Sequence, residues 1–332
     1  MSSRARAVLR SPMMVLAGIC LVPVMGAPKP FDACRTATNA VYNSCTAGAQ
    51  SDKALAIGKC DNLADATASK ACRAQAASDA KDGRDGCAEQ RKFRIAACGK
   101  LGPAPYSPAI DPVNFVATVD NPYYPLPPGT TYVYEGNTAA GLEHNEVAVT
   151  HNTKVILGVT CVEVLDTVTV GGELTERTLD WFAQDKDGNV WYFGENSEEL
   201  SGGLVVDLGG SFAAGVDGAE PGIIMKAHPA VGDFYRQEFL LGEAEDLAEV
   251  LSLSESVVVP AGSFDHCLKT EETEAIDPSD APFGEARLEA FLAGSEPQDN
   301  DVLARLTAVV RSFEGGRPAF DDIAAMLVTI AR

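Results

Sequence analysis

Hydrophobic and polar positions change their pattern sharply near residue 100. Between residues 34 and 98 the chain is rich in alanine, and six cysteines recur at intervals of 11, 15, 12, 15 and 11 residues. Intervals of 11 and 15 residues are about three and four helical turns, so cysteines spaced in this way share one face of a helix. From residue 130 onwards, short runs of valine, threonine and aromatic residues alternate with glycine, asparagine and aspartate. The pattern predicts an α+β protein, with a helical unit over residues 27–100 and an antiparallel β unit over residues 130–275.

The spacing of the six cysteines is symmetrical about residue 66. An antiparallel helical hairpin that turns there would place them opposite one another in three nested pairs, Cys34 with Cys98, Cys45 with Cys87, and Cys60 with Cys72. Three short helices with other pairings are the alternative, because six cysteines allow about 15 connectivities. A zinc site is disfavoured, since closely spaced C-x₂₋₄-C pairs are absent.

The first 26 residues resemble a cleavable export signal. Basic residues precede a mostly apolar run over residues 13–24, which is too short to span a bilayer comfortably. The basic residues are Arg4, Arg6 and Arg10. We expect cleavage between Gly26 and Ala27, and no second apolar segment of membrane length follows. The sequence therefore predicts a secreted or periplasmic mature chain without a transmembrane segment.

Cysteine usage agrees with export. Lipidation of Cys20 is disfavoured because Ile19 occupies the place where a lipoprotein signal has a small residue. Removal of Cys20 with the signal leaves eight cysteines. An even number in an exported chain indicates disulfides. Cys161 and Cys267 are the two in the β unit, and we expect them to pair and link distant strands of one sheet. A reactive thiol is the alternative.

The β unit follows a proline-rich segment. Residues 101–129 contain many prolines, which predicts a linker or an extended wrap. The β-rich runs beyond it are residues 130–135, 146–150, 153–170, 178–184 and 190–194, and they fit an antiparallel meander that forms a sandwich or a half-barrel. Asp185 to Asn189 begins like a calcium-binding EF-hand loop, but the later bidentate glutamate and the flanking helices are not matched. An Asp-Gly hairpin turn is the favoured interpretation.

Charge limits the possible partners. The chain has 47 acidic and 26 basic residues, a net charge of −21, which makes nucleic acid a poor partner. Acidic residues gather at Glu243, Glu245, Asp246 and Glu249. They are candidates for acid–base catalysis or calcium binding, although a solvated helix face with Glu245 and Glu249 on one side explains them as well.

No catalytic residue or cofactor is predicted. The four histidines, His144, His151, His228 and His266, lie outside any G-x-S-x-G or H-E-x-x-H motif. Aromatic residues of the predicted strands should form the core or line an apolar pocket. They are Tyr132, Tyr134, Trp181, Trp191, Tyr192 and Phe193.

Two resemblances concern different parts of the chain. Residues 121–130, 184–195, 221–225, 235–238 and 257–264 resemble a family of uncharacterised secreted bacterial proteins over about residues 85–275, and that family implies no activity. Residues 273–275, 282–288 and 320–323 resemble the C-terminal end of PPM-type serine/threonine phosphatases of the bacterial sporulation branch. The second resemblance implies a metal ligand at Asp321 or Asp322.

The phosphatase resemblance covers only the tail. Glu271-Glu272 replaces the Asp-Gly expected before Thr-Glu-Ala, and the N-terminal acidic metal motif has no counterpart. Residues 276–332 therefore read as a remnant, with helical spacing over residues 285–293 and 301–313 and a short strand over residues 323–330. Three functions follow in order of preference: a non-enzymatic module that binds a small ligand or a protein partner, a secreted hydrolase or lyase that uses the acidic cluster, and a metal-dependent phosphatase.

Overall fold

The structure, a computed structural model, describes residues 31–138, 140–259 and 262–275, together with the backbones of three short strands at residues 285–290, 308–312 and 329–331. The predicted signal peptide and its cleavage site lie outside the described residues. All features below belong to the part of the chain that begins at Asp32.

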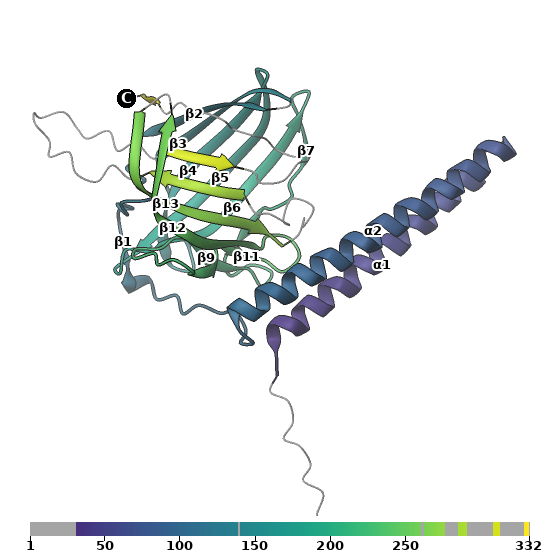
Figure 1. Cartoon of the computed structure of the whole chain (residues 1–332), viewed down its shortest axis with the longest axis horizontal. Coiled ribbons are helices and arrows are strands. Elements are labelled where there is room, and N and C mark those ends of the chain that lie inside the picture. The colour runs from purple at the N-terminus through teal and green to yellow at the C-terminus, as the bar shows by residue number, and fades with distance from the viewer. Residues whose placement is uncertain are drawn as a thin grey trace, which may run out of the picture. The chain divides into compact units, whose positions relative to one another are not determined.

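The helical unit is an antiparallel hairpin of α1 (Ala33–Asp61) and α2 (Ala66–Leu101) (Figure 1). Its three disulfides join Cys34 to Cys98, Cys45 to Cys87 and Cys60 to Cys72, with Cα–Cα distances of 5.7, 5.8 and 5.5 Å. The nested pairing predicted from the symmetrical spacing is thus confirmed.

Local sequence explains where each helix begins. The carboxylate of Asp32 accepts a hydrogen bond from the Arg35 amide at 2.9 Å, and that of Asp65 accepts one from the Ala68 amide at 2.7 Å. Such N-caps contribute about 1 kcal/mol each. In α1 only Thr38 and Cys60 are buried, so the hairpin has little apolar core and depends on its disulfides.

The proline-rich segment packs against the β unit as an extended wrap. It forms the short helix η1 (Pro112–Asn114) and the strand β1 (Phe115–Val116). Val119 and Leu126 are buried in the larger hydrophobic core, and the Phe115 ring packs edge-to-face on Phe193 with centroids 5.4 Å apart.

The larger sheet has 11 strands, most of them in the order β11-β9-β6-β5-β4-β3-β2-β16. β2 to β6 are antiparallel neighbours in chain order, which confirms the predicted meander and half-barrel (Figure 1). Besides β1, the strands are β2 (Thr131–Thr138), β3 (Gly141–Ile156), β4 (Val159–Val170), β5 (Glu173–Asp185), β6 (Val190–Ser201), β7 (Leu204–Asp207), β8 (Phe212–Ala213), β9 (Glu220–Met225), β11 (Glu238–Phe239) and β16 (Thr329–Ala331).

The smaller sheet has five strands in the order β10-β12-β13-β14-β15. They are β10 (Phe234–Arg236), β12 (Asp246–Val259), β13 (Gly262–Glu274), β14 (Glu285–Ala290) and β15 (Ala308–Ser312). One hydrophobic cluster contains residues of both sheets, among them Phe182 and Tyr192 of the larger sheet and Val250 and Leu268 of the smaller.

Two turns show how glycine shapes the meander. The run at residues 153–170, predicted as one β segment, is divided between β3 and β4, because Leu157 and Gly158 turn the chain with φ of 50° and 80°. The predicted Asp-Gly turn joins β5 to β6, and the Gly188 amide donates to the Asp185 carbonyl at 3.0 Å. The Asp185 carboxylate accepts from the Asn189 amide and side chain, both at 2.8 Å.

The predicted pairing of Cys161 with Cys267 is wrong. Both are free and buried, and they lie on β4 of the larger sheet and β13 of the smaller one. Cys161 packs in a separate cluster with Trp181 and Phe193, so the two β-rich runs do not bring the thiols together. Burial raises the pKa of the Cys161 thiol to about 12 and raises that of Cys267 as well, which argues against a reactive thiol.

The tail also differs from the sequence prediction. Helices were expected over residues 285–293 and 301–313, whereas β14 and β15 are strands. β14 pairs with β13 along Glu285 to Glu289, and β15 pairs with β14. A paired strand forms backbone hydrogen bonds whatever the spacing of its apolar residues. Pairing with a neighbouring strand therefore overrides the local preference of these segments for helix. β16 overlaps the strand predicted over residues 323–330.

Candidate functional site

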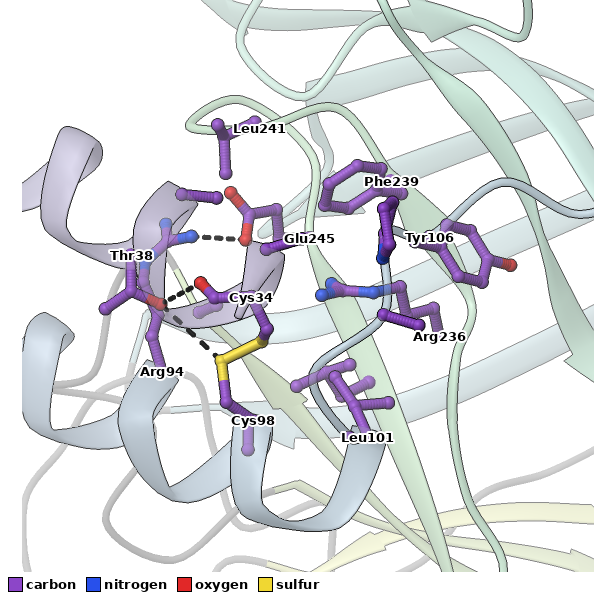
Figure 2. Close-up of a pocket in the computed structure, with 18 residues that line it drawn as sticks. Cys34, Thr38, Arg94, Cys98, Leu101, Tyr106, Arg236, Phe239, Leu241 and Glu245 are labelled. Carbon is purple, nitrogen blue, oxygen red and sulfur yellow. Dashed lines mark hydrogen bonds and ion pairs between the residues drawn. A yellow bond between two sulfur atoms is a disulfide. The ribbon is translucent and has the colours of Figure 1, made fainter. Parts of the chain in front are cut away.

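A pocket of about 280 Å³ lies where α1, α2 and the segment after them meet the start of β12 (Figure 2). Most of its walls are apolar. The apolar and aromatic lining residues are Ala33, Ala37, Ala97, Leu101, Ala104, Pro105, Tyr106, Phe239, Leu241, Leu247 and Ala275, beside the Cys34–Cys98 disulfide. Three charged side chains complete it: Arg94, Arg236 and Glu245.

The hairpin places Arg94 at this pocket. Arg94 precedes Cys98 by four residues, so it lies on the face of α2 that carries the disulfide to α1. Its side chain is 5% exposed and forms an ion pair through Nη1 with Oε2 of Glu245, which is 3% exposed. Nε and Nη2 of Arg94 are buried, and no described residue accepts a hydrogen bond from them.

Glu245 is held by both of its oxygens. It stands after a tight turn in which the Leu240 and Ala244 backbones bridge, and directly before β12. Oε2 accepts from Arg94, and Oε1 accepts from the Gly242 amide at 2.6 Å. Each oxygen thus has one donor, which fills about two of the four lone-pair sites of the carboxylate.

Arg236 reaches the pocket from the end of β10. Its guanidinium lies 4.4 Å from the centroid of the Phe239 ring and 5.4 Å from that of Tyr106. Figure 2 shows it directed toward the Cys34–Cys98 disulfide across the pocket. Burial lowers the pKa of Arg236, whereas the Glu245 carboxylate opposes that shift. Burial also raises the pKa of Tyr106 to about 12, so its hydroxyl stays protonated and donates to the Pro221 carbonyl at 2.9 Å.

The charge of the pocket is opposite to that of the protein. Its lining contains two guanidinium groups and one carboxylate, which leaves one positive charge in excess. The whole chain carries −21. Since the walls are mostly apolar, water screens this charge less than it would at the surface.

A second cluster of ionisable groups lies inside the sheets. Asp180 on β5 is 8% exposed and Glu238 on β11 is 7% exposed, and Tyr192 on β6 bonds to Asp180. Burial is the first cause that raises the pKa of both carboxyls well above the usual range. Burial likewise raises the pKa of Glu195 to about 7, although its hydrogen bond from Tyr192 opposes the shift.

The acidic cluster predicted from the sequence is not a helix face. Asp246 and Glu249 belong to strand β12, and Glu243 lies in the turn before it. Glu249 forms an ion pair with Lys100 of α2, so it and Glu245 both contact the hairpin and are not simply solvated. Only Glu245 of the four lines the pocket.

The aromatic candidates are part of the structural core. Trp181 is buried, Lys154 lies 3.1 Å from its ring centroid, and its indole donates to Glu163 at 3.3 Å. Trp191 donates to Asp185 at 2.8 Å, and Tyr192 is buried in the larger cluster. None of the three lines the pocket. Asp321 and Asp322 lie outside the described residues.

Sequence reasoning missed the two arginines and Tyr106. A signal for Arg94 was present, because a charged residue one helical turn before Cys98 falls on the disulfide-bearing face. Arg236 had no such signal, since only the fold brings β10 to the hairpin.

Within the described residues, no group of three or more potential ligands is placed to hold a metal ion, and no helix there is long and apolar enough to cross a membrane.

No protein-family model, curated protein or solved structure matches this chain.

Proposed function

We propose that this chain is a non-enzymatic module of an exported protein, and that it binds a small ligand in the pocket at the base of the helical hairpin. The observation that supports this most is a mostly apolar concavity of about 280 Å³ into which a few charged groups converge. Natural ligand sites combine these two properties. The volume lies at the lower end of the range of ligand pockets, about 300 to 1,000 Å³, so the ligand is small.

Export fits the covalent structure of the hairpin. Three disulfides persist in an oxidising compartment and are rare in the cytosol. The N-terminal sequence pattern supplies the export signal, and the resemblance to secreted bacterial proteins points the same way.

The hydrolase or lyase alternative has less support. It assigns acid–base chemistry to Glu245 and Asp246, but both oxygens of Glu245 already accept hydrogen bonds. A general base needs an oxygen within reach of a substrate proton. The phosphatase alternative depends on Asp321 and Asp322, and the absence of manganese-dependent phosphoester turnover would count against it.

Ligand-observed NMR with a set of neutral and charged fragments of about ten heavy atoms tests the binding function. Ala104 lines the pocket but is exposed, so Ala104→Trp narrows the pocket without overpacking the interior. Ala77→Trp, at an exposed position of α2 outside the pocket, is the matched control. We expect bound fragments to be lost in Ala104→Trp and kept in Ala77→Trp. Equal binding to both variants, or no binding to the wild type, would contradict the proposal.

A further inference from the structure

Arg236 is the charged group of the pocket that lacks an acceptor. A guanidinium carries five N–H donors. Its contacts are the rings of Tyr106 and Phe239, and its guanidinium makes no hydrogen bond or ion pair with any residue that the structure describes. Aromatic faces attract a cation but do not accept its N–H groups as oxygen does.

Glu245 does not fill this role. It lies in the same pocket, but Arg94 and the Gly242 amide engage its two oxygens. Arg94 in turn has two buried donors without an acceptor among the described residues. Arg236 itself is half-buried and its guanidinium lies against mostly apolar and aromatic walls, so the excess charge of the pocket favours an incoming anion.

We propose that the ligand of this pocket is a small monoanionic carboxylate with a hydrocarbon body. This inference rests on the ligand-binding function proposed above. The two carboxylate oxygens match the paired N–H groups of the Arg236 guanidinium. The hydrocarbon part lies along Leu101, Leu241 and Leu247.

The balance of charge distinguishes a carboxylate from other head groups. A single negative charge neutralises the excess of one guanidinium, whereas a neutral amide leaves it uncompensated. A phosphate monoester, with close to two negative charges at neutral pH, would leave a surplus negative charge among apolar walls beside Glu245.

Calorimetric titration of the full chain with octanoate, octanamide and octyl phosphate tests this directly. The three probes share one hydrocarbon chain and differ in the head group. We expect octanoate to bind at least about tenfold more tightly than either of the others. Equal or tighter binding of octanamide or octyl phosphate overturns the carboxylate assignment.

Variants at Arg236 test whether this residue causes the preference for a carboxylate head group. Arg236→Met keeps a long side chain against Phe239 and Tyr106 but removes the charge, so octanoate should lose at least about tenfold in affinity and its advantage over octanamide. Arg84→Met, at an exposed position of α2 outside the pocket, should leave both titrations unchanged. An unchanged octanoate affinity in Arg236→Met contradicts the proposal.

The two proposals fail in different ways. If fragments bind and Ala104→Trp blocks them, but octanoate has no advantage over octanamide, only the carboxylate inference fails. If the wild type binds neither the fragments nor any octyl probe, the binding function itself fails. The comparison of head groups uses only wild-type protein, so it is informative even if Arg236→Met does not fold.

Discussion

Tyr192 places its hydroxyl 2.5 Å from Oδ1 of Asp180 and 3.0 Å from Oε2 of Glu195. A phenol has one hydrogen to donate. When it is donated to one carboxylate, the second short contact is favourable only if the other carboxyl is protonated and donates to the phenol oxygen. The geometry thus fits a pair in which one of the two carboxyls is protonated, and burial is the first cause that raises the pKa of both acids.

Stability should therefore fall as pH rises through the range in which Glu195 ionises. Its pKa is about 7 in the folded state, whereas the unfolded chain loses the proton near the ordinary glutamate pKa of 4.5. Between these values the folded state binds more protons, so the free energy of unfolding decreases with pH, by on the order of 2 to 3 kcal/mol for this group. Urea unfolding at pH 5 and pH 7.5 measures the difference. Glu195→Gln should flatten the profile, and an equally steep profile in that variant would exclude Glu195 as its source.

Breaking the buried ion pair should cost more than replacing it. Arg94→Met leaves the buried Glu245 carboxylate without its cation, and we expect a loss of about 3 to 5 kcal/mol in unfolding free energy. The double variant with Glu245→Gln should recover most of this loss. Lys100→Met, which breaks the more exposed pair with Glu249, serves as the control and should cost at most about 1 kcal/mol. Additive single and double effects in the urea midpoints would show that Arg94 and Glu245 are not coupled.

Removal of the innermost disulfide should loosen one end of the hairpin. Cys60→Ala with Cys72→Ala opens a loop of 12 residues, worth about 3 kcal/mol in the chain-entropy treatment of disulfides. Amide hydrogen exchange should accelerate near residues 56–76 and stay slow around the Cys34–Cys98 disulfide. Uniform acceleration along both helices would mean that the hairpin opens as a single unit.

Two glycines should respond in opposite directions to alanine. A Cβ atom at Gly222 would lie 2.2 Å from the Gln237 carbonyl, so Gly222→Ala must push β9 away from β11, and we expect a loss of about 2 kcal/mol or more. Gly86 lies in α2, where an added methyl group would meet no atom within 4 Å, so Gly86→Ala should stabilise the protein by about 0.5 to 1 kcal/mol. Thermal unfolding compares the two, and a stabilising Gly222→Ala would refute the close approach.

Residues with a local or periodic signal allowed good prediction from the sequence. The symmetrical spacing of the cysteines determined the hairpin and its three disulfides, and Asp-Gly at residues 187–188 determined the turn between β5 and β6. Each depends on short stretches of backbone geometry that the residues themselves specify.

Features that depend on how strands associate could not be predicted. Cys161 and Cys267 lie in similar β-rich runs, yet the chain places those runs in different sheets. Glu245 and Glu249 have helical spacing, yet Glu249 lies in strand β12 and Glu245 directly before it. Cations of α2 form ion pairs with both carboxylates. Arg236 reaches the pocket only because β10 pairs with β12 beside the hairpin. Long-range contacts of this kind leave no periodic trace in one sequence.

The two free thiols give each sheet its own reporter of opening. Cys161 and Cys267 are both 0% exposed, so a thiol-specific reagent can modify either one only during a transient exposure of its surroundings. Mass spectrometry of the two peptides gives a separate labelling rate for each cysteine. The two rates would therefore report how often the half-barrel and the smaller sheet open. Because the other cysteines of the described chain are held in disulfides, no engineered label is needed to see which sheet opens first.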